Sequence, residues 1–416
     1  MQGQAPLSPR APRVYIPQGP TPPPMGPGKA EYLRQLTATL PMFSMEVGRE
    51  MEGSTPPSIF IGAWNYPAVD AGPMMAPVHG DTRVMDTPEE WIPGRKTQEE
   101  IIGYRMGLVR GKRRVRVNDR DSRYASLLRE IALSEGSVES EAAFAHIPQG
   151  CSFSEDHAPF GPSAPVERFE IGNVRWNRDL ERAFHDTDLS ATGAMVDLHR
   201  RGIPFSSIQK ALSAGALGTG PHRRLVPTRW SITACDSALG DHLLGRVRQH
   251  PLLDTVRVHE FSSLHNTYAV ILLPTSWQYE WMEAFLHVMG REELLFADHE
   301  GFRRKKEYSS VGGCFYSCRM AVLEALAREG RQAGAIILRE AYQGYVPLGV
   351  FNVRENVRQA MLRPGQEFED LEAALAALAP RLALPVDRFL SESTLLADLH
   401  RGTGQRTLGD FIGRAG

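Results

Sequence analysis

The side chains best suited to chemistry are charged, hydroxyl-bearing and aromatic residues that gather near the ends of expected strands. They are Arg229, Trp230, Ser231, Asp236, Glu340, Arg354 and Asn356. Charged residues at such places are frequent in sites built where strands stop. They predict a pocket in an enzyme that acts on a nucleotide or a DNA end. Its candidate catalytic residues are Arg229, Asp236, Glu340 and Arg354. The same pattern is frequent in buried ion pairs that organise turns, and this alternative stays open.

Known catalytic and metal-binding motifs do not account for these residues. No spacing matches a zinc site, a Walker loop, a dinucleotide-binding fingerprint or a hydrolase elbow, and the glycine-rich stretch 215–220 lacks the lysine and hydroxyl of a phosphate loop. Cys314 and Cys318 lie four residues apart on an expected helix. A place in the core is favoured over a metal half-site for them, because no further ligands are evident. We therefore predict no metal, and any cofactor is unknown.

Two basic clusters stand out in a chain whose formal net charge is only −2. The first cluster comprises Arg110, Lys112, Arg113, Arg114 and Arg116, and the second comprises Arg303, Arg304, Lys305 and Lys306. Such residues neutralise DNA phosphates, and the nearby aromatic rings of Tyr104, Tyr124, Phe302 and Tyr308 could stack on unpaired bases. The clusters indicate a non-catalytic DNA-binding adaptor as an alternative function. A solvated loop or a network of surface ion pairs explains each cluster equally well.

The C-terminal tail carries an apolar pattern on an otherwise polar segment. Its members are Gln405, Leu408, Phe411 and Ile412. Side chains three apart eclipse in a 3₁₀ turn, so Leu408 and Phe411 would point the same way, with Ile412 beside them. The pattern is similar to the peptide by which DNA-processing proteins dock on a sliding clamp. Packing of the tail onto its own body is the alternative. Docking is favoured because the glycine-rich start of the tail is typical of a loose tether.

The bulk composition is that of a globular chain with a substantial core. The chain has 416 residues, of which 42% are hydrophobic and 23% charged, so two or three domains or one large composite are expected. No apolar run is long enough to cross a membrane, and residues 1–28 lack the apolar core of a signal peptide. Four cysteines fit a reducing compartment. We therefore expect a cytoplasmic, nucleoid-associated protein without a membrane partner.

Composition shifts divide the chain into four segments. Residues 1–28 hold nine of the thirty prolines and are expected to form a disordered leader. The loop at 149–165, rich in Gly, Pro and Ser, is the best domain boundary. The expected organisation is a leader (1–28), an N-terminal domain (29–150), a C-terminal domain (166–401) and a flexible tail (402–416).

The elements that position these residues predict a mixed α/β or α+β fold, with a largely helical N-terminal part and a mixed-sheet C-terminal domain. Helices are predicted at 28–40, 97–109, 121–134, 137–145, 179–184, 192–201, 204–214, 236–249, 278–289, 313–328, 354–362 and 368–378. Strands are predicted at 58–63, 230–235, 256–261, 267–273 and 334–339, and a further strand begins at Val350.

Several stretches resemble the archaeal Nre family. They are Phe60-Ile61-Gly62, Tyr66-Pro67, Gly72-Pro73-Met74, Asp81-Thr82, Pro88-Glu89-Glu90-Trp91, Leu108-Val109-Arg110-Gly111, the run from Val226 to Thr233, Gly312-Gly313 with Tyr316, Pro347-Leu348-Gly349 and the run from Val353 to Arg358. The resemblance covers roughly residues 55–412 and includes the tail. It implies participation in DNA-damage repair and docking on a sliding clamp related to PCNA. Archaeal members typically open with a four-cysteine segment thought to bind zinc. Because this chain has no cysteine before Cys151, that site is expected to be missing.

Overall fold

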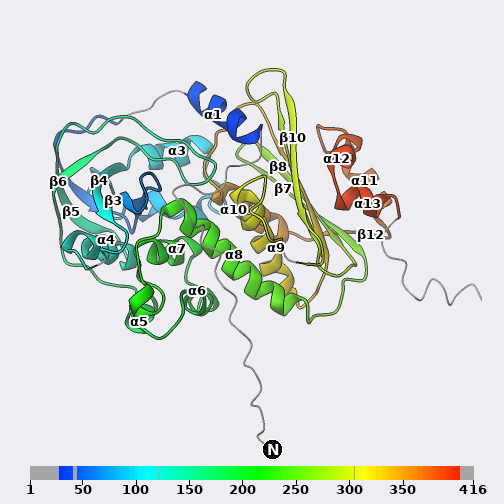
Figure 1. Cartoon of the computed structure of the whole chain (residues 1–416). Coiled ribbons are helices and arrows are strands. Elements are labelled where there is room, and N and C mark those ends of the chain that lie inside the picture. Colours follow the sequence, from blue (N-terminus) through cyan, green and yellow to red (C-terminus); the bar gives the residue numbers. More distant parts are fainter. Residues whose placement is uncertain (1–27, 41–44, 120, 304, 403–416) are drawn as a thin grey trace, which may run out of the picture.

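The fold is built around two β-sheets with helices between them (Figure 1). The structure, a computed structural model, describes residues 28–40, 45–119, 121–303 and 305–402. Within these residues each sheet has six strands. Among the helices of the same residues, none combines the length and the apolar composition needed to cross a membrane.

The first sheet has the strand order β1-β5-β6-β4-β3-β2 and is antiparallel except where β4 pairs with β6. Its strands are β1 (Glu50–Thr55), β2 (Ile59–Ile61), β3 (Ala68–Met75), β4 (Val109–Arg116), β5 (Val138–Phe144) and β6 (Ser163–Ile171). One face packs on helix α4 (Arg123–Leu133), whose Tyr124, Leu128 and Ile131 lie in the same core cluster as Val69, Val115 and Phe144.

The second sheet has the order β10-β9-β11-β8-β7-β12, with β9 and β11 parallel and the other pairs antiparallel. Its strands are β7 (Val256–Ser263), β8 (Asn266–Leu273), β9 (Tyr279–Leu286), β10 (Glu293–Glu300), β11 (Gly334–Ala341) and β12 (Gln366–Phe368). Because β9, β11 and β8 lie inside the sheet, their residues are buried on both faces, apart from Thr267 of β8.

Helices cover both faces of this second sheet (Figure 1). One face packs on α8 (Thr228–Val247), α9 (Gly313–Glu329) and α10 (Phe351–Leu362), and the other on α11 (Leu371–Leu378), α12 (Val386–Glu392) and α13 (Leu395–His400). Strand β8 shows the division, since Val270 faces α8 and α9 whereas the adjacent Ile271 faces α11 to α13. This alternation follows from the two-residue period of a strand.

The remaining helices surround the first sheet or connect it to the second. They are α1 (Lys29–Thr39), the 3₁₀ turn η1 (Arg83–Asp86), α2 (Pro88–Trp91), α3 (Gln98–Met106), α5 (Arg178–His185), α6 (Ala191–Arg200), α7 (Phe205–Ser213) and the 3₁₀ turn η2 (Gly220–His222). Helix α1 precedes the first sheet in the chain but packs on the second, where Tyr32 contacts Phe285.

The expectation of a largely helical N-terminal part is wrong. The first sheet occupies residues 50–171 of this region, and the segment 137–145, predicted to be a helix, is strand β5. Val138, Ser140, Ala142 and Phe144 are its buried positions, and the residues between them are exposed or half-buried. This two-residue period identifies a strand, and the serine taken for a helix cap precedes it.

Three further element predictions are wrong because burial hides periodicity. The segment 230–235, predicted as a strand, lies in α8, in which fourteen of twenty residues are buried. The segment 278–289, predicted as a helix, contains β9, in which all eight residues are buried. No strand begins at Val350, because α10 starts at the next residue. A fully buried element has no polar face to show its period.

Several elements agree with the sequence-based predictions, whereas strands β1, β3, β4, β6 and β10 were not predicted. The capping box of Thr97 and Glu100 opens α3, Ser122 caps α4, and Gly330 ends α9 in a left-handed conformation. The other confirmed elements are α1, α5, α6, α7, α11, β2, β7, β8 and β11. Cys314 and Cys318 are both buried in α9, which confirms their place in the core.

Candidate functional site

Four of the seven predicted pocket residues lie along α8. The Trp230 ring is buried against Tyr66 of the first half of the chain, with ring centroids 5.0 Å apart. The Ser231 hydroxyl is fully buried; it donates to the Thr228 carbonyl at 2.8 Å and accepts from the Gln209 amide at 2.6 Å. These two side chains therefore fix the N-terminal end of α8.

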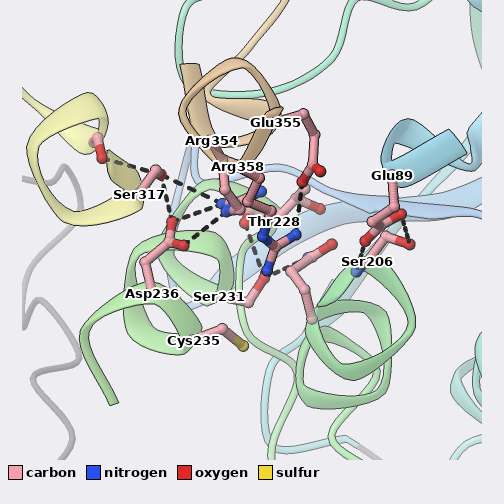
Figure 2. A network of polar contacts seen from close by, with 12 residues as sticks. Glu89, Ser206, Thr228, Ser231, Cys235, Asp236, Ser317, Arg354, Glu355 and Arg358 are labelled. Carbon is pink, nitrogen blue, oxygen red and sulfur yellow. Dashed lines mark hydrogen bonds and ion pairs between the residues drawn. The ribbon is translucent and has the colours of Figure 1, made fainter. Parts of the chain in front are cut away.

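Asp236 and Arg354 form a bidentate ion pair between α8 and α10 (Figure 2). Arg354 donates to the two carboxylate oxygens at 2.9 and 2.7 Å, and the Ser317 hydroxyl of α9 donates at 2.6 Å. The guanidinium lies 3.7 Å from the centre of the Phe205 ring. Burial raises the pKa of Asp236 in spite of Arg354 and Ser317. The pair thus ties three helices together and depends on its cation to stay ionised.

Arg229 contacts a different acid. Its Nε lies 2.9 Å from Oδ2 of Asp156, in the loop between β5 and β6. Burial raises the pKa of Asp156 in spite of Arg229. The Arg229 side chain remains about one third exposed, so it is the most accessible of the four candidate catalytic residues.

Glu340 and Asn356 do not line the cavity that borders Arg354. Glu340 of β11 accepts hydrogen bonds from the backbone of Ala383 and Leu384, just before α12. Asn356 of α10 accepts from the Ser263 hydroxyl at 2.7 Å, at the end of β7. Of the predicted pocket residues, Asp236 and Arg354 are therefore in direct contact, whereas Glu340 and Asn356 have other partners.

The cavity itself lies between the two halves of the molecule, with a volume of about 70 Å³. Its charged lining includes three residues that the sequence-based prediction missed: Asp86 of η1, Arg105 of α3 and Lys210 of α7. Asp86 lies 2.5 Å from Arg105 and 3.2 Å from Lys210. Burial opposes the charge on Asp86, but these two cations hold its pKa below the ordinary value. No motif marks this triad, because its members come from three separate elements.

The volume limits what the cavity can hold. A water molecule occupies about 30 Å³ in the liquid, so the space takes two or three waters or one small ion. A pocket for a nucleotide-sized ligand is usually several hundred Å³. The acids at or beside the cavity are already engaged, since Asp86, Asp156 and Asp236 each contact at least one arginine. This arrangement joins the two halves and can retain a small polar guest.

Glu355 is a further buried acid of this region whose ionisation is perturbed. It lies next to Arg354 on α10 and accepts from Arg358 at 2.7 Å (Figure 2). Burial raises its pKa to about 7, and Glu89 adds to the effect, whereas Arg358 and Arg354 oppose it. Glu355 therefore exchanges a proton near neutral pH.

Stability is expected to depend on pH through Glu355. Because its pKa is higher in the folded state, its stabilising contribution is full below about 4.5 and is lost as the pH rises through about 7. Glu355→Gln removes this loss. Between pH 5 and pH 8 the free energy of unfolding of the variant should gain about 2–3 kcal/mol relative to the wild type. Urea unfolding at both pH values measures this. The exposed Glu372→Gln is the control, and identical pH profiles for wild type and Glu355→Gln would contradict the assignment.

A second buried cluster joins α1 to the second sheet. Among the described residues, Glu155, Glu283 and Cys314 place ligand-type atoms within 4.8 Å of one another. The ammonium of Lys29 contacts both carboxylates, at 2.8 Å from Glu155, and donates to the Val311 carbonyl at 2.9 Å. Lys29 and Arg339, which also contacts both carboxylates, thus supply the positive charge of this site.

The first basic cluster lies on β4, inside the first sheet. Arg110 is packed against Phe60 and Phe160, and burial lowers its pKa to about 10. Arg113 covers the Tyr124 ring at 4.6 Å on the opposite face. Within this cluster Lys112 lies 3.3 Å from the Ser163 hydroxyl, Arg114 pairs with Asp70 at 2.8 Å, and Arg116 is exposed. The strand therefore divides the cluster between two faces.

The second basic cluster lies in the loop between β10 and α9. Lys305 pairs with Asp298 at 2.8 Å, whereas Arg303 and Lys306 are exposed. Arg304 lies outside the described residues. The same holds for the four members of the tail pattern, Gln405, Leu408, Phe411 and Ile412.

Comparison with known proteins covers nearly the whole chain. The N-terminal model of archaeal Nre matches residues 28–288, and the C-terminal model matches residues 300–411. The chain is 39% identical over 377 residues to the DNA repair protein NreB of Archaeoglobus fulgidus, covering 88% of this chain and 93% of the relative. It is 32% identical to the DNA repair protein NreA of the same organism, over 79% of this chain and 84% of the relative.

A third relative comes from another archaeon. The chain is 31% identical over 371 residues to the DNA repair protein NreA of Haloferax volcanii, covering 85% of this chain and 88% of the relative. No solved structure matches. With both family models matched in order and a relative aligned over almost its full length, this chain belongs to the archaeal Nre family.

Proposed function

We propose that this protein is a DNA-repair factor that docks on a ring-shaped sliding clamp through its C-terminal segment. The observation that carries the repair role is the extent of the match, since 93% of a relative named as a DNA repair protein aligns with this chain. The alignment is not restricted to one module, so the chain shares the architecture of a protein with that role.

Docking on the clamp is supported by the sequence of the C-terminal tail and by the position of α13, the helix that precedes it. The last described helix, α13, is anchored by Leu396 in the outer face of the second sheet, and Gly402 follows in a left-handed conformation. The pattern Gln405, Leu408, Phe411 and Ile412 begins three residues later. Gln405 would occupy a small polar pocket of the clamp, and the three apolar side chains would enter an apolar one.

The test compares the full chain with its truncation after His400 and with Leu408→Ala/Phe411→Ala. Full burial of each apolar side chain contributes about 1.5–3 kcal/mol, so losing two should weaken binding to a purified sliding clamp at least about 100-fold. Isothermal titration calorimetry measures the affinity, and thermal melting should show an unchanged fold. Arg406→Ala/Asp410→Ala changes residues between the anchors and is the matched control. Unchanged clamp affinity in the truncated chain would rule out docking by the tail.

Contact with DNA itself is a second component of the proposal. The exposed Arg116, Arg303 and Lys306 support it, because such side chains are free to neutralise phosphates. Arg110 supports it less, since its guanidinium is committed to two aromatic rings. The alternative of an enzyme acting on a nucleotide or DNA end retains Arg229, Asp236 and Arg354 as its candidates.

A further inference from the structure

A surface hollow of about 480 Å³ lies among four helices, and none of the predicted sites includes it. Its charged and imidazole side chains come from all four. They are His199 and Arg200 of α6, His242 and Arg246 of α8, Arg328 of α9 and Arg358 of α10, with Glu324 of α9 as the one acid in the lining. A volume of this size suits a small organic ligand.

The ion pairs in the hollow leave a surplus of positive charge. Glu324 is fully engaged, since it accepts two hydrogen bonds from Arg358 at 2.7 and 2.8 Å and contacts His199 at 2.7 Å. Burial raises the pKa of Glu324, but Arg358 and His199 outweigh burial and lower it to about 2. Arg200 pairs with Asp197 at 2.8 Å, outside the hollow. Glu324 and Asp197 are therefore already paired with Arg358, His199 and Arg200.

Arg246 and Arg328 are the two arginines left over. Both are exposed, and within the described part of the chain neither has an ion pair or a hydrogen bond from its side chain. The charge of Arg246 also acts on His242, whose pKa is lowered by burial first and then by Arg246, His199 and Arg200. The rim of the hollow is thus positive at neutral pH even with both histidines uncharged.

The floor of the hollow is apolar. It is formed by Leu243 of α8, Ala321 and Ala325 of α9, and Met361 of α10, all buried. Leu362 at the rim is 59% exposed. A ligand that fits this hollow has negative charges that contact the arginines of the rim. It also has an uncharged flat or ring-shaped portion that contacts the apolar floor. A nucleotide unit of a nucleic-acid strand has both.

We propose that this hollow binds a segment of a DNA strand, with Arg246 and Arg328 contacting its phosphates and the apolar floor contacting a sugar or base. The DNA origin of the ligand rests on the proposed repair function. The hollow is connected to the Asp236–Arg354 ion pair through α10. Its Arg358 donates to Glu355 at 2.7 Å, and Glu355 is the residue after Arg354 (Figure 2).

The test measures binding of a fluorescent single-stranded 20-mer by anisotropy at several salt concentrations. Arg246→Gln/Arg328→Gln should weaken binding at least about tenfold. It should also reduce the slope of log affinity against log salt by about 1.4, because each phosphate contact on single strands contributes about 0.7. Arg178→Gln/Arg291→Gln removes two exposed arginines elsewhere on the surface, with the same change in net charge, and should have little effect. Thermal melting verifies that each variant is folded.

Two outcomes would overturn the proposal. One is a double variant that binds the strand with the affinity and salt slope of the wild type. The other is wild-type binding of the mononucleotide dAMP as tight as that of the strand, which would make the hollow a nucleotide site. Clamp affinity of the same variants separates the proposals, because loss of the hollow should leave docking by the tail unchanged. Conversely, truncation after His400 should leave strand binding unchanged.

Discussion

Replacing Arg354 by methionine is expected to lower the free energy of unfolding by about 3–5 kcal/mol. The guanidinium supplies two hydrogen bonds to Asp236, and both side chains are almost fully buried. Methionine fills a similar space but leaves a carboxylate in the core without its cation. Since burial raises the pKa of Asp236 even beside Arg354, the variant should take up a proton there. Urea unfolding followed by circular dichroism measures the loss.

Two further variants make this result interpretable. Arg291→Met removes an exposed arginine and should change stability by less than about 0.5 kcal/mol. Asp236→Leu/Arg354→Met removes both charges and should recover most of the lost stability, because a buried ion pair is often replaceable by apolar groups. Wild-type stability of Arg354→Met would contradict the structural role. Together with loss of an activity on nucleotides or DNA ends, it would favour Arg354 as a catalytic residue.

Replacing Lys29 by methionine is expected to destabilise the protein by a similar amount, about 3–5 kcal/mol. The ammonium contacts Glu155 and Glu283, and both acids also contact Arg339, at 3.3 and 2.7 Å. Without Lys29 two buried carboxylates would share one arginine. Burial already raises the pKa of Glu283 in spite of Lys29, so the variant should bind a proton more tightly in its folded state. The destabilisation should therefore be larger at pH 8 than at pH 5.

The rescue variant for this site is Lys29→Met/Glu283→Gln, which removes one positive and one negative charge together. It should be more stable than Lys29→Met alone, and the difference in a double-mutant cycle gives the coupling of the two groups. Lys306→Met changes an exposed lysine and is the control. Equal stabilities of Lys29→Met and the rescue variant at pH 8 would show that the ion pair between Lys29 and Glu283 does not stabilise the packing of α1 on the second sheet.

Adjacent residues of strand β11 show how far sequence reasoning about the site could go. Arg339 and Glu340 lie near the end of the apolar strand β11. Neighbours on a strand point to opposite faces, so Arg339 joins the Lys29 cluster and Glu340 holds the chain before α12. The sequence-based prediction placed Glu340 in the pocket, whereas the pleat of the strand turns it toward the segment before α12.

The sequence by itself determined several elements in which a polar face shows the period or a cap shows the end. Helices α3, α4 and α6 are examples. It missed strands β1, β3, β4, β6 and β10 and assigned β5 to a helix. Largely buried elements such as α8 and β9 carry little of this contrast between polar and apolar faces. The resemblance to the Nre family could also be recognised from the sequence, because it depends on many short stretches of residues and not on knowledge of the fold.

Only the tertiary structure decided which distant side chains meet. Asp236 and Arg354 are 118 positions apart, and Lys29 and Glu283 are 254 apart. The basic hollow likewise takes its arginines from four helices. Such groupings depend on how strands pair and helices cross, and no local pattern of residue types records those choices, since each segment satisfies its own backbone hydrogen bonds whichever partner it packs against.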